Sequence, residues 1–205
     1  MMKSFSKNYI YFFAIVITIV FISSCTSDSD KYNAVVKKEL AKGVRVDSLF
    51  LGIHFGMTSK EFYGYCWELN KKGLLTDGNN NTAVLYKITN ELKYPASMNF
   101  YPQFFDNRIG VMGVNFQYNG WAPWNKALFA DSLLPDVLNM YKKWYPAGND
   151  FIKITNKQKG TVYVKVDGNR RITVGKFNDV LVKVDYTDLL IEQKLKKQNE
   201  EEKGF

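Results

Sequence analysis

The stretch Leu51–Phe62, which reads LGIHFGMTSKEF, contains the start signal of the best-specified helix in the chain. Thr58 is typical of an N-cap residue. Glu61 stands three positions later, as in a capping box, where each of the two side chains bonds the other residue's backbone amide. Met57 precedes the cap and can pack against Phe62 inside the helix. The stretch therefore predicts a helix that begins directly after Thr58.

The residues that follow complete this helix. An apolar stripe with spacing i, i+3, i+4 and i+7 indicates a helix with one buried side. The stripe consists of Phe62, Tyr65, Cys66 and Leu69. Gly73 suits the left-handed position after a helix end, and Leu74 can then contact Leu69, as in a Schellman motif. We expect Cys66 to be a small buried hydrophobic residue.

Alternation of apolar and polar residues predicts strands on both sides of a second helix, which covers roughly residues 127–145. Three strands precede this helix, around residues 84–88, 98–100 and 112–118. Four follow it, at 151–155, 161–166, 171–175 and 180–186, and Asp167-Gly168-Asn169 forms a hairpin turn. A last helix starts near Asp188 and leads into a charged tail. This order predicts an α+β fold, an antiparallel sheet with helices packed on one face.

The same order divides the chain into four segments: a signal segment (1–24), a tether (25–46) and two folded units (47–124 and 125–205). The first unit is a helix plus three strands, and the second is a helix plus four strands and the C-terminal helix. Two tandem units would fit an internal duplication. The Gly-Met-Thr signature does not recur before the second helix, where Asn125-Lys126-Ala127 stands, so the sequence leaves the duplication open.

The amino terminus has the pattern of a secretory signal. Lys3 and Lys7 precede an apolar run from Tyr9 to Ile22, which is shorter than the roughly 20 residues that a membrane-spanning helix needs. The run ends in Ile22-Ser23-Ser24-Cys25, which resembles the lipobox of bacterial lipoproteins. This resemblance implies that Cys25 is the first mature residue, carries lipid such as palmitate, and anchors the chain to the outer membrane. The sequence leaves open whether the chain lies on the periplasmic or the cell-surface side.

Cleavage before Cys25 would change the charge and the cysteine inventory. The net charge of +8 would fall by two lysines, to 8 − 2 = +6, and Cys66 would be the one remaining free thiol. An intramolecular disulfide is then excluded, although an exported compartment permits one. The lysines are dispersed and form no block typical of nucleic-acid binding, so we expect no nucleic-acid partner.

The motif Gly56-Met57-Thr58-x-x-x-Phe62 also resembles two known groups. One is the small lipoprotein of the outer-membrane β-barrel assembly machinery, and the other is the secreted β-lactamase-inhibitor proteins. Both groups place such a helix start ahead of an antiparallel sheet. The resemblance implies a non-enzymatic protein that presents a sheet face or loops to another protein. This chain is longer than the assembly lipoprotein, and the inhibitors lack a lipid.

The sequence offers little for catalysis. It has a single histidine, His54, and none of the common motifs for zinc, phosphate or nucleophilic serine. Acidic pairs such as Asp28/Asp30 and Asp185/Asp188 could in principle act as a general acid and base. Most such pairs are solvated or capping residues. We therefore expect no enzyme activity, no cofactor and no metal, with a hydrolase as the least favoured alternative.

If helices cover one face of the sheet, the alternate strand residues form an outward surface of aromatic, amide and basic side chains. Such a surface suits a cell-envelope protein partner, an acidic one in particular, and an anionic glycan or lipid headgroups are alternative ligands. An inhibitor-like or glycan-binding surface module is the alternative function. Two tryptophans in the loop after the third strand could instead stack on a glycan, or fill the seam between the two units. The candidate binding residues are Lys87, Asn99, Tyr101, Asn115, Gln117, Trp121, Trp124, Tyr163, Lys165, Arg171 and Lys183.

Overall fold

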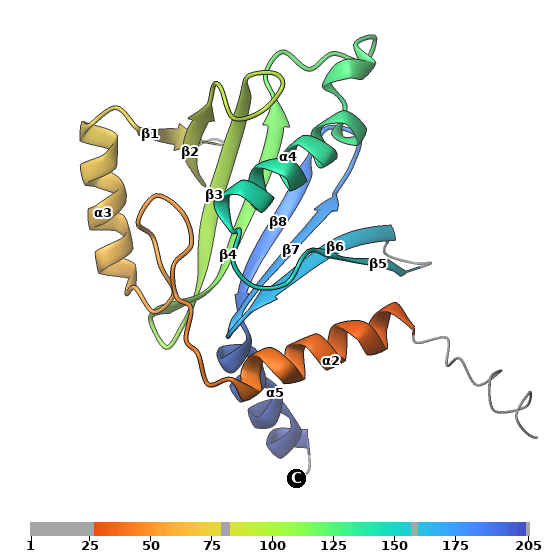
Figure 1. The fold of residues 1–205 in the computed structure, drawn as a ribbon. Helices are drawn as coiled ribbons and strands as arrows, with labels where there is room; N and C mark the ends of the chain where they lie inside the picture. Colours follow the sequence, from red (N-terminus) through yellow and green to blue (C-terminus); the bar gives the residue numbers. More distant parts are fainter. Residues whose placement is uncertain (1–26, 79–82, 157–159, 204–205) are drawn as a thin grey trace, which may run out of the picture.

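The structure is a computed structural model that describes residues 27–78, 83–156 and 160–203 (Figure 1). Cys25 and the predicted signal segment lie outside the described residues. Within these ranges the chain forms helices α2 (Asp28–Ala41), α3 (Ser59–Lys71), α4 (Ala130–Trp144) and α5 (Leu189–Lys203), and a short 3-10 helix at Lys126–Leu128. The strands are β1 (Leu75–Gly78), β2 (Ala83–Ile88), β3 (Ala96–Phe105), β4 (Arg108–Tyr118), β5 (Ile152–Asn156), β6 (Gly160–Asp167), β7 (Arg170–Lys176) and β8 (Val182–Asp188).

The strands form one antiparallel sheet in the order β1-β2-β3-β4-β8-β7-β6-β5. Each half of the chain contributes a four-stranded meander, and the last strand of each meander pairs with that of the other, so β4 lies against β8. The α+β class is therefore confirmed. The first unit has four strands and not three, because β1 uses the Leu75–Gly78 segment next to the polar loop and pairs with β2.

The start and end of α3 follow the local signals in the sequence. The Thr58 N–H donates to Glu61 Oε2 at 2.7 Å, and the Glu61 N–H donates to Thr58 Oγ1 at 3.3 Å, which completes the capping box. At the other end the Leu74 N–H donates to the Leu69 carbonyl, and Gly73 adopts φ +73°. These bonds form a Schellman motif, so both ends of this helix are satisfied by residues within reach in the sequence.

The main core lies between α4 and one face of the sheet, which we call the closed face. Alternate β4 residues Met112, Val114 and Phe116 are fully buried there, and the register places them beside Val184 and other apolar residues of β8. The α4 helix contributes a buried stripe to the same core, which includes Leu133, Val137, Met140 and Tyr141.

Residues 28–41 differ from the predicted tether. They form the 14-residue helix α2, whose N-cap Ser27 and Asp30 make a second capping box. The helix packs through Tyr32, Val35, Val36 and Leu40 against Ile154, Val162, Val164 and Val166 of β5 and β6. The reason is tertiary: these strand residues would be exposed without α2, and the short helix is stabilised mainly by packing on them.

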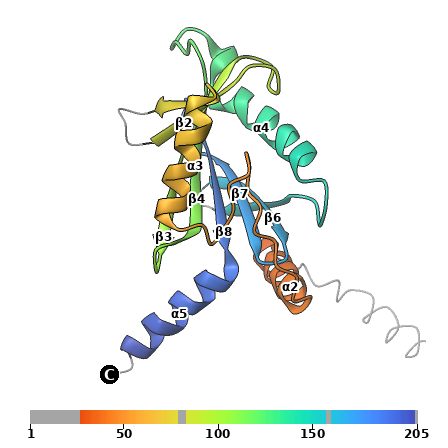
Figure 2. The same ribbon diagram turned by 90° about the vertical axis from the view of Figure 1, so that its left-hand side faces the viewer.

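The expectation that the helices pack on one face is corrected. In β6, Tyr163 is paired with Val174 and packs with the main core, whereas Val162, Val164 and Val166 point to the other face and contact α2. The helices α4 and α2 therefore cover opposite faces, and α3 lies along the edge formed by β1 and β2 (Figures 1 and 2). Among the described residues, no helix is both long enough and apolar enough to cross a membrane.

Candidate functional site

Among the described residues, the sheet face opposite α4 is covered at its β5–β6 end by α2 and where α5 begins, and α3 borders it at Tyr101, whose hydroxyl is hydrogen-bonded to that of Tyr63. We call the remaining part the open face. The register places its residues in rows that cross the sheet: Tyr101, Gly113, Asp185 and Thr173 form one row, and Asn99, Asn115, Lys183 and Gly175 form the next. Five predicted binding residues, Tyr101, Asn115, Gln117, Arg171 and Lys183, therefore lie on one face, as do Lys87 and Asn99.

The open face has a hollow of ≈ 730 Å³, which lies within the range of about 300–1,000 Å³ that is typical of binding sites. Gly113 and Gly175 add no side chain to this face; the backbone at Gly113 is partly accessible, whereas Gly175 is buried beside Val162. The hollow is lined by Gln103, Val111, Ile154, Gly160, Val162, Arg171, Thr173, Lys183, Asp185 and Thr187.

Three charged groups of the open face, Arg171, Lys183 and Asp185, are paired with each other or with a helix. Lys183 Nζ lies 3.1 Å from the Asp185 carboxylate, and Arg171 Nη1 lies 2.9 Å from that of Glu192 on α5. Arg171 also donates to the Tyr32 hydroxyl of α2. These exposed or half-exposed pairs are easily rearranged, because surface ion pairs contribute little net stability. A partner can exchange them for its own contacts at small cost.

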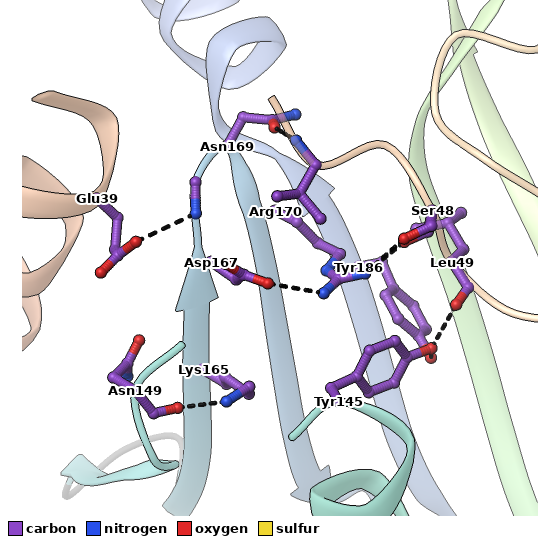
Figure 3. Close-up of polar contacts among 12 residues, drawn as sticks. Glu39, Ser48, Leu49, Tyr145, Asn149, Lys165, Asp167, Asn169, Arg170 and Tyr186 are labelled. Atoms are coloured by element: carbon purple, nitrogen blue, oxygen red, sulfur yellow. Dashed lines mark hydrogen bonds and ion pairs between the residues drawn. The ribbon is translucent and has the colours of Figure 1, made fainter. Parts of the chain in front are cut away.

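Two of the predicted binding residues that belong to strands are on the opposite face. Tyr163 and Lys165 point to the closed side of β6, because β6 has apolar residues on both faces and the alternation was assigned to the wrong one. Lys165 is buried, and its ammonium donates to the Asn149 carbonyl (Figure 3). Burial lowers the pKa of Lys165 from its ordinary value. Lys165 is therefore not available to a partner, whereas Tyr163 is partly exposed on the closed side.

The two tryptophans of the β4–α4 connection have different environments. Trp121 is half-buried and packs on Phe129, the N-cap residue of α4, with 5.6 Å between ring centroids. It therefore fixes this connection to the start of α4. Trp124 is 83% exposed. Neither tryptophan lines the hollow of the open face.

A second hollow, of ≈ 380 Å³, lies between α3 and the β1–β3 end of the sheet. We call it the aromatic groove, because the exposed rings of Tyr63, Trp67 and Tyr101 line it together with Asn70, Thr76 and Asp77. The Tyr63 and Tyr101 hydroxyls are hydrogen-bonded, and this bond raises the pKa of Tyr63. The sequence carried a signal for the groove that was missed: Tyr63 and Trp67 are four residues apart, outside the buried stripe of α3.

A polar cluster around Arg170 supports the fold. It lies at the β6–β7 hairpin, where α2 also makes contact (Figure 3). Arg170 is buried, pairs with Asp167 at 3.0 Å, and lies over the Tyr145 ring at 4.6 Å. It also donates to the Ser48 carbonyl. These contacts join Arg170 to other residues of the protein. Through Ser48 they hold the segment that follows α2 in place.

A buried tyrosine network under α4 was also missed by the sequence analysis. Tyr186 donates to the Tyr141 hydroxyl, Tyr145 donates to the Leu49 carbonyl, and the Tyr145 and Tyr186 hydroxyls are 2.9 Å apart. Burial raises the pKa of Tyr145 to about 12 and raises those of Tyr141 and Tyr186 well above the ordinary value. The hydroxyls stay protonated and serve the core.

The remaining titratable candidates do not assemble into a catalytic arrangement. His54 is exposed, and its Nδ1 lies 2.8 Å from the Phe55 carbonyl oxygen. Asp185 pairs with Lys183, whereas Asp188 is fully buried and pairs with Arg45 at 3.1 Å. Within the described ranges, no group of three or more His, Cys, Asp or Glu side chains is placed to hold a metal ion.

Comparisons of the chain with protein-family models, with curated proteins and with solved structures found no match.

Proposed function

We propose that this chain is a non-enzymatic lipoprotein of the outer membrane, anchored through Cys25, that binds or scaffolds a cell-envelope protein through the open face. The signal pattern before Cys25 supports the anchor. The resemblance to the assembly lipoprotein and to the inhibitor proteins rests on the Gly-Met-Thr motif and on a helix that precedes an antiparallel sheet. The resemblance implies a protein that presents a sheet face or loops to another protein, and this is the function proposed here for the open face.

The observation that carries this proposal is that α4 covers one face of the sheet and leaves most of the opposite face free. Tyr101, Asn115, Gln117 and Lys183 project from adjacent strands on a face that α4 leaves free. Tyrosine and arginine are enriched where proteins contact each other, and amides supply hydrogen bonds around such anchors. A partner that covers the hollow would bury Tyr101 at one side and Arg171 at the other.

Crosslinking and pull-down of the tagged full chain from intact cells test this function. We expect specific envelope proteins to be enriched with the wild-type chain. Tyr101→Ala and Lys183→Glu should each reduce that enrichment severalfold. Phe177→Ala and Lys142→Glu are the matched controls, because both residues are exposed and lie outside the open face. A Cys25→Ser chain shows which partners require the anchor.

Equal enrichment with the open-face and control variants would contradict binding by this face. Absence of any enriched protein would contradict the scaffold function as a whole. Turnover of an envelope substrate that is lost with one acidic substitution, and retained with His54→Ala, would contradict the non-enzymatic assignment.

A specific observation favours a second candidate function, the binding of a glycan in the aromatic groove. The groove combines exposed rings with hydroxyl, amide and carboxylate groups, and its lining contains no lysine or arginine. Aromatic rings can stack on the C–H faces of sugars, while the polar groups fix orientation. Binding of cell-envelope polysaccharide that is lost in Trp67→Ala and kept in Trp124→Ala would support it. Equal binding by both variants would exclude the groove.

A further inference from the structure

The helix α2 begins very close to the predicted anchor. Ser27 is its N-cap, so only Thr26 separates the cap from Cys25. Two Cα–Cα steps span at most about 7.6 Å. A flexible tether over residues 25–46 would instead have a root-mean-square span of about 26 Å. The two cases differ greatly in how closely they hold the folded body to a bilayer.

The helix is also firmly attached to the body. Its apolar side chains pack on β5 and β6, and its Glu39 is buried, with 4% of its surface exposed. The Glu39 carboxylate accepts hydrogen bonds from Lys42 Nζ at 2.7 Å and from the Gly168 N–H at 3.3 Å. Tyr32, one turn into the helix, accepts from Arg171 of β7. Contacts therefore hold α2 near both of its ends.

The direction of α2 decides which part of the body would approach the membrane. Glu39, near its carboxyl end, meets the β6–β7 turn at Gly168, so α2 runs along β6 in the same direction. Its amino end therefore lies at the end of the sheet where β5 ends and β6 begins. Figure 1 shows this end on the side of the molecule opposite α3, the helix that lines the aromatic groove.

We infer that α2 is a rigid support, which we call the seat, and that it holds the β5–β6 end of the sheet directly against the lipid headgroups. The inference rests on the proposed acylation of Cys25. The surface that the seat presents to the bilayer consists of the first turn of α2 and the adjoining ends of β5 and β6. The open face then lies beside the leaflet and the aromatic groove faces away from it. A protein bound to the open face is accordingly one that is itself in or on the same membrane.

Energy transfer from single dyes to an acceptor lipid tests the seat. The acylated protein is purified from membranes of cells that express the full chain, and is placed in phosphatidylcholine vesicles. The dyes are attached to Lys31→Cys, in the first turn of α2, or to Lys72→Cys, after α3. Both positions are exposed. A Cys66→Ala background removes the remaining thiol, which is buried in any case and whose pKa burial raises to about 11.

We expect transfer from the Lys31→Cys dye to exceed that from the Lys72→Cys dye by about twofold or more, because α2 alone is about 21 Å long. Insertion of about 20 Gly and Ser residues between Thr26 and Ser27 adds a span of about 25 Å and should bring the two values together. Equal transfer without the insertion, or no effect of the insertion, would overturn the seat.

Failure of the proposed anchor has a different readout. If the protein from cells does not float with membranes and carries no lipid, the acylation proposal fails. The geometry is then tested on a chain that begins at Cys25, with the 1,2-aminothiol of this amino-terminal cysteine condensed with a cyanobenzothiazole phospholipid, a ring closure that an internal cysteine cannot undergo, before the second position is labelled. The same comparison of the two dyes with and without the insertion applies, so the seat is supported or overturned by its own result.

Discussion

The two faces of the sheet use the same strands for opposite purposes. On β4, Met112, Val114 and Phe116 are fully buried under α4, while Gly113, Asn115 and Gln117 between them remain partly accessible on the open face. The closed face has large apolar side chains and a hydrogen-bonded tyrosine network. The open face has glycines, amides and exchangeable ion pairs.

This difference separates the residues that hold the fold from those available for recognition. Removing atoms from the closed face leaves cavities or unpaired polar groups, which are costly in a close-packed core. Changes on the open face act mainly on water-exposed groups and should leave the fold intact.

The largest difference in stability is expected between variants at two neighbouring positions of β4. Phe116→Ala should lower the free energy of unfolding by about 3–5 kcal/mol, because it opens a cavity under α4. Asn115→Ala should change it by no more than about 0.5 kcal/mol. Urea denaturation followed by circular dichroism measures both values. A large cost for Asn115→Ala would mean that the open face is covered in the folded protein.

The next largest loss of stability is expected in the buried tyrosine network. Tyr186→Phe removes a buried hydroxyl that donates to Tyr141, and should cost about 1–3 kcal/mol because a buried oxygen loses its partner. Tyr101→Phe is the matched change at an exposed hydroxyl pair and should be close to neutral. Thermal unfolding of the two variants compares them. Similar losses in both would contradict a special role for the buried network.

The attachment of α2 should depend on pH through Glu39. Burial alone would raise the pKa of Glu39, but the hydrogen bonds from Lys42 and the Gly168 N–H outweigh it and lower the pKa. The folded-state pKa therefore lies below the unfolded value, so this stabilisation is present above the ordinary pKa of about 4.3 and is lost as pH falls through the folded value.

Replacement of the Glu39 carboxylate by an amide should remove this stabilisation and therefore lower the free energy of unfolding. Glu39→Gln should cost about 1–2 kcal/mol at neutral pH, and the difference from wild type should shrink as pH falls below about 4. Glu68→Gln, at an exposed pair with Lys71, is the control and should show little change at any pH. Urea denaturation at several pH values provides the measurement. A cost that is independent of pH would contradict the assigned role of the charge.

The smallest effect on stability is expected at Gly113, where a side chain would enter the open face. A Cβ there would meet Asp185 Oδ1 at 3.6 Å and the Tyr101 carbonyl at 3.7 Å, which are ordinary contacts. Gly113→Val should therefore fold normally and gain up to about 0.5–1 kcal/mol in the strand. The same side chain should block a partner at the open face and reduce its recovery in pull-downs.

Gly64→Ala in α3 is the matched control, because it adds a methyl group in open space and favours the helix without entering the open face. Full partner recovery with Gly113→Val would show that recognition uses another surface, such as the aromatic groove.

Local patterns predicted much of the fold and part of the site. Alternation in β4 assigned Asn115 and Gln117 to the outward face, because one side of that strand is strongly apolar. The same rule failed in β6, where Tyr163 and Lys165 alternate with three valines and both sides are buried against different helices. The aromatic groove was missed because Tyr101 and Trp67 are distant in sequence and are brought together only by packing of α3 on the sheet edge.

By itself the sequence determined the elements whose signals are local. The capping box of Thr58 and Glu61, the stop at Gly73 and the Gly168 hairpin each depend on hydrogen bonds between residues a few positions apart. Only the tertiary structure decided that β4 pairs with β8, that α2 is part of the body, and which face stays open. Those outcomes depend on which apolar surfaces cover one another, and burial is a property of the assembled layers that no short stretch of sequence contains.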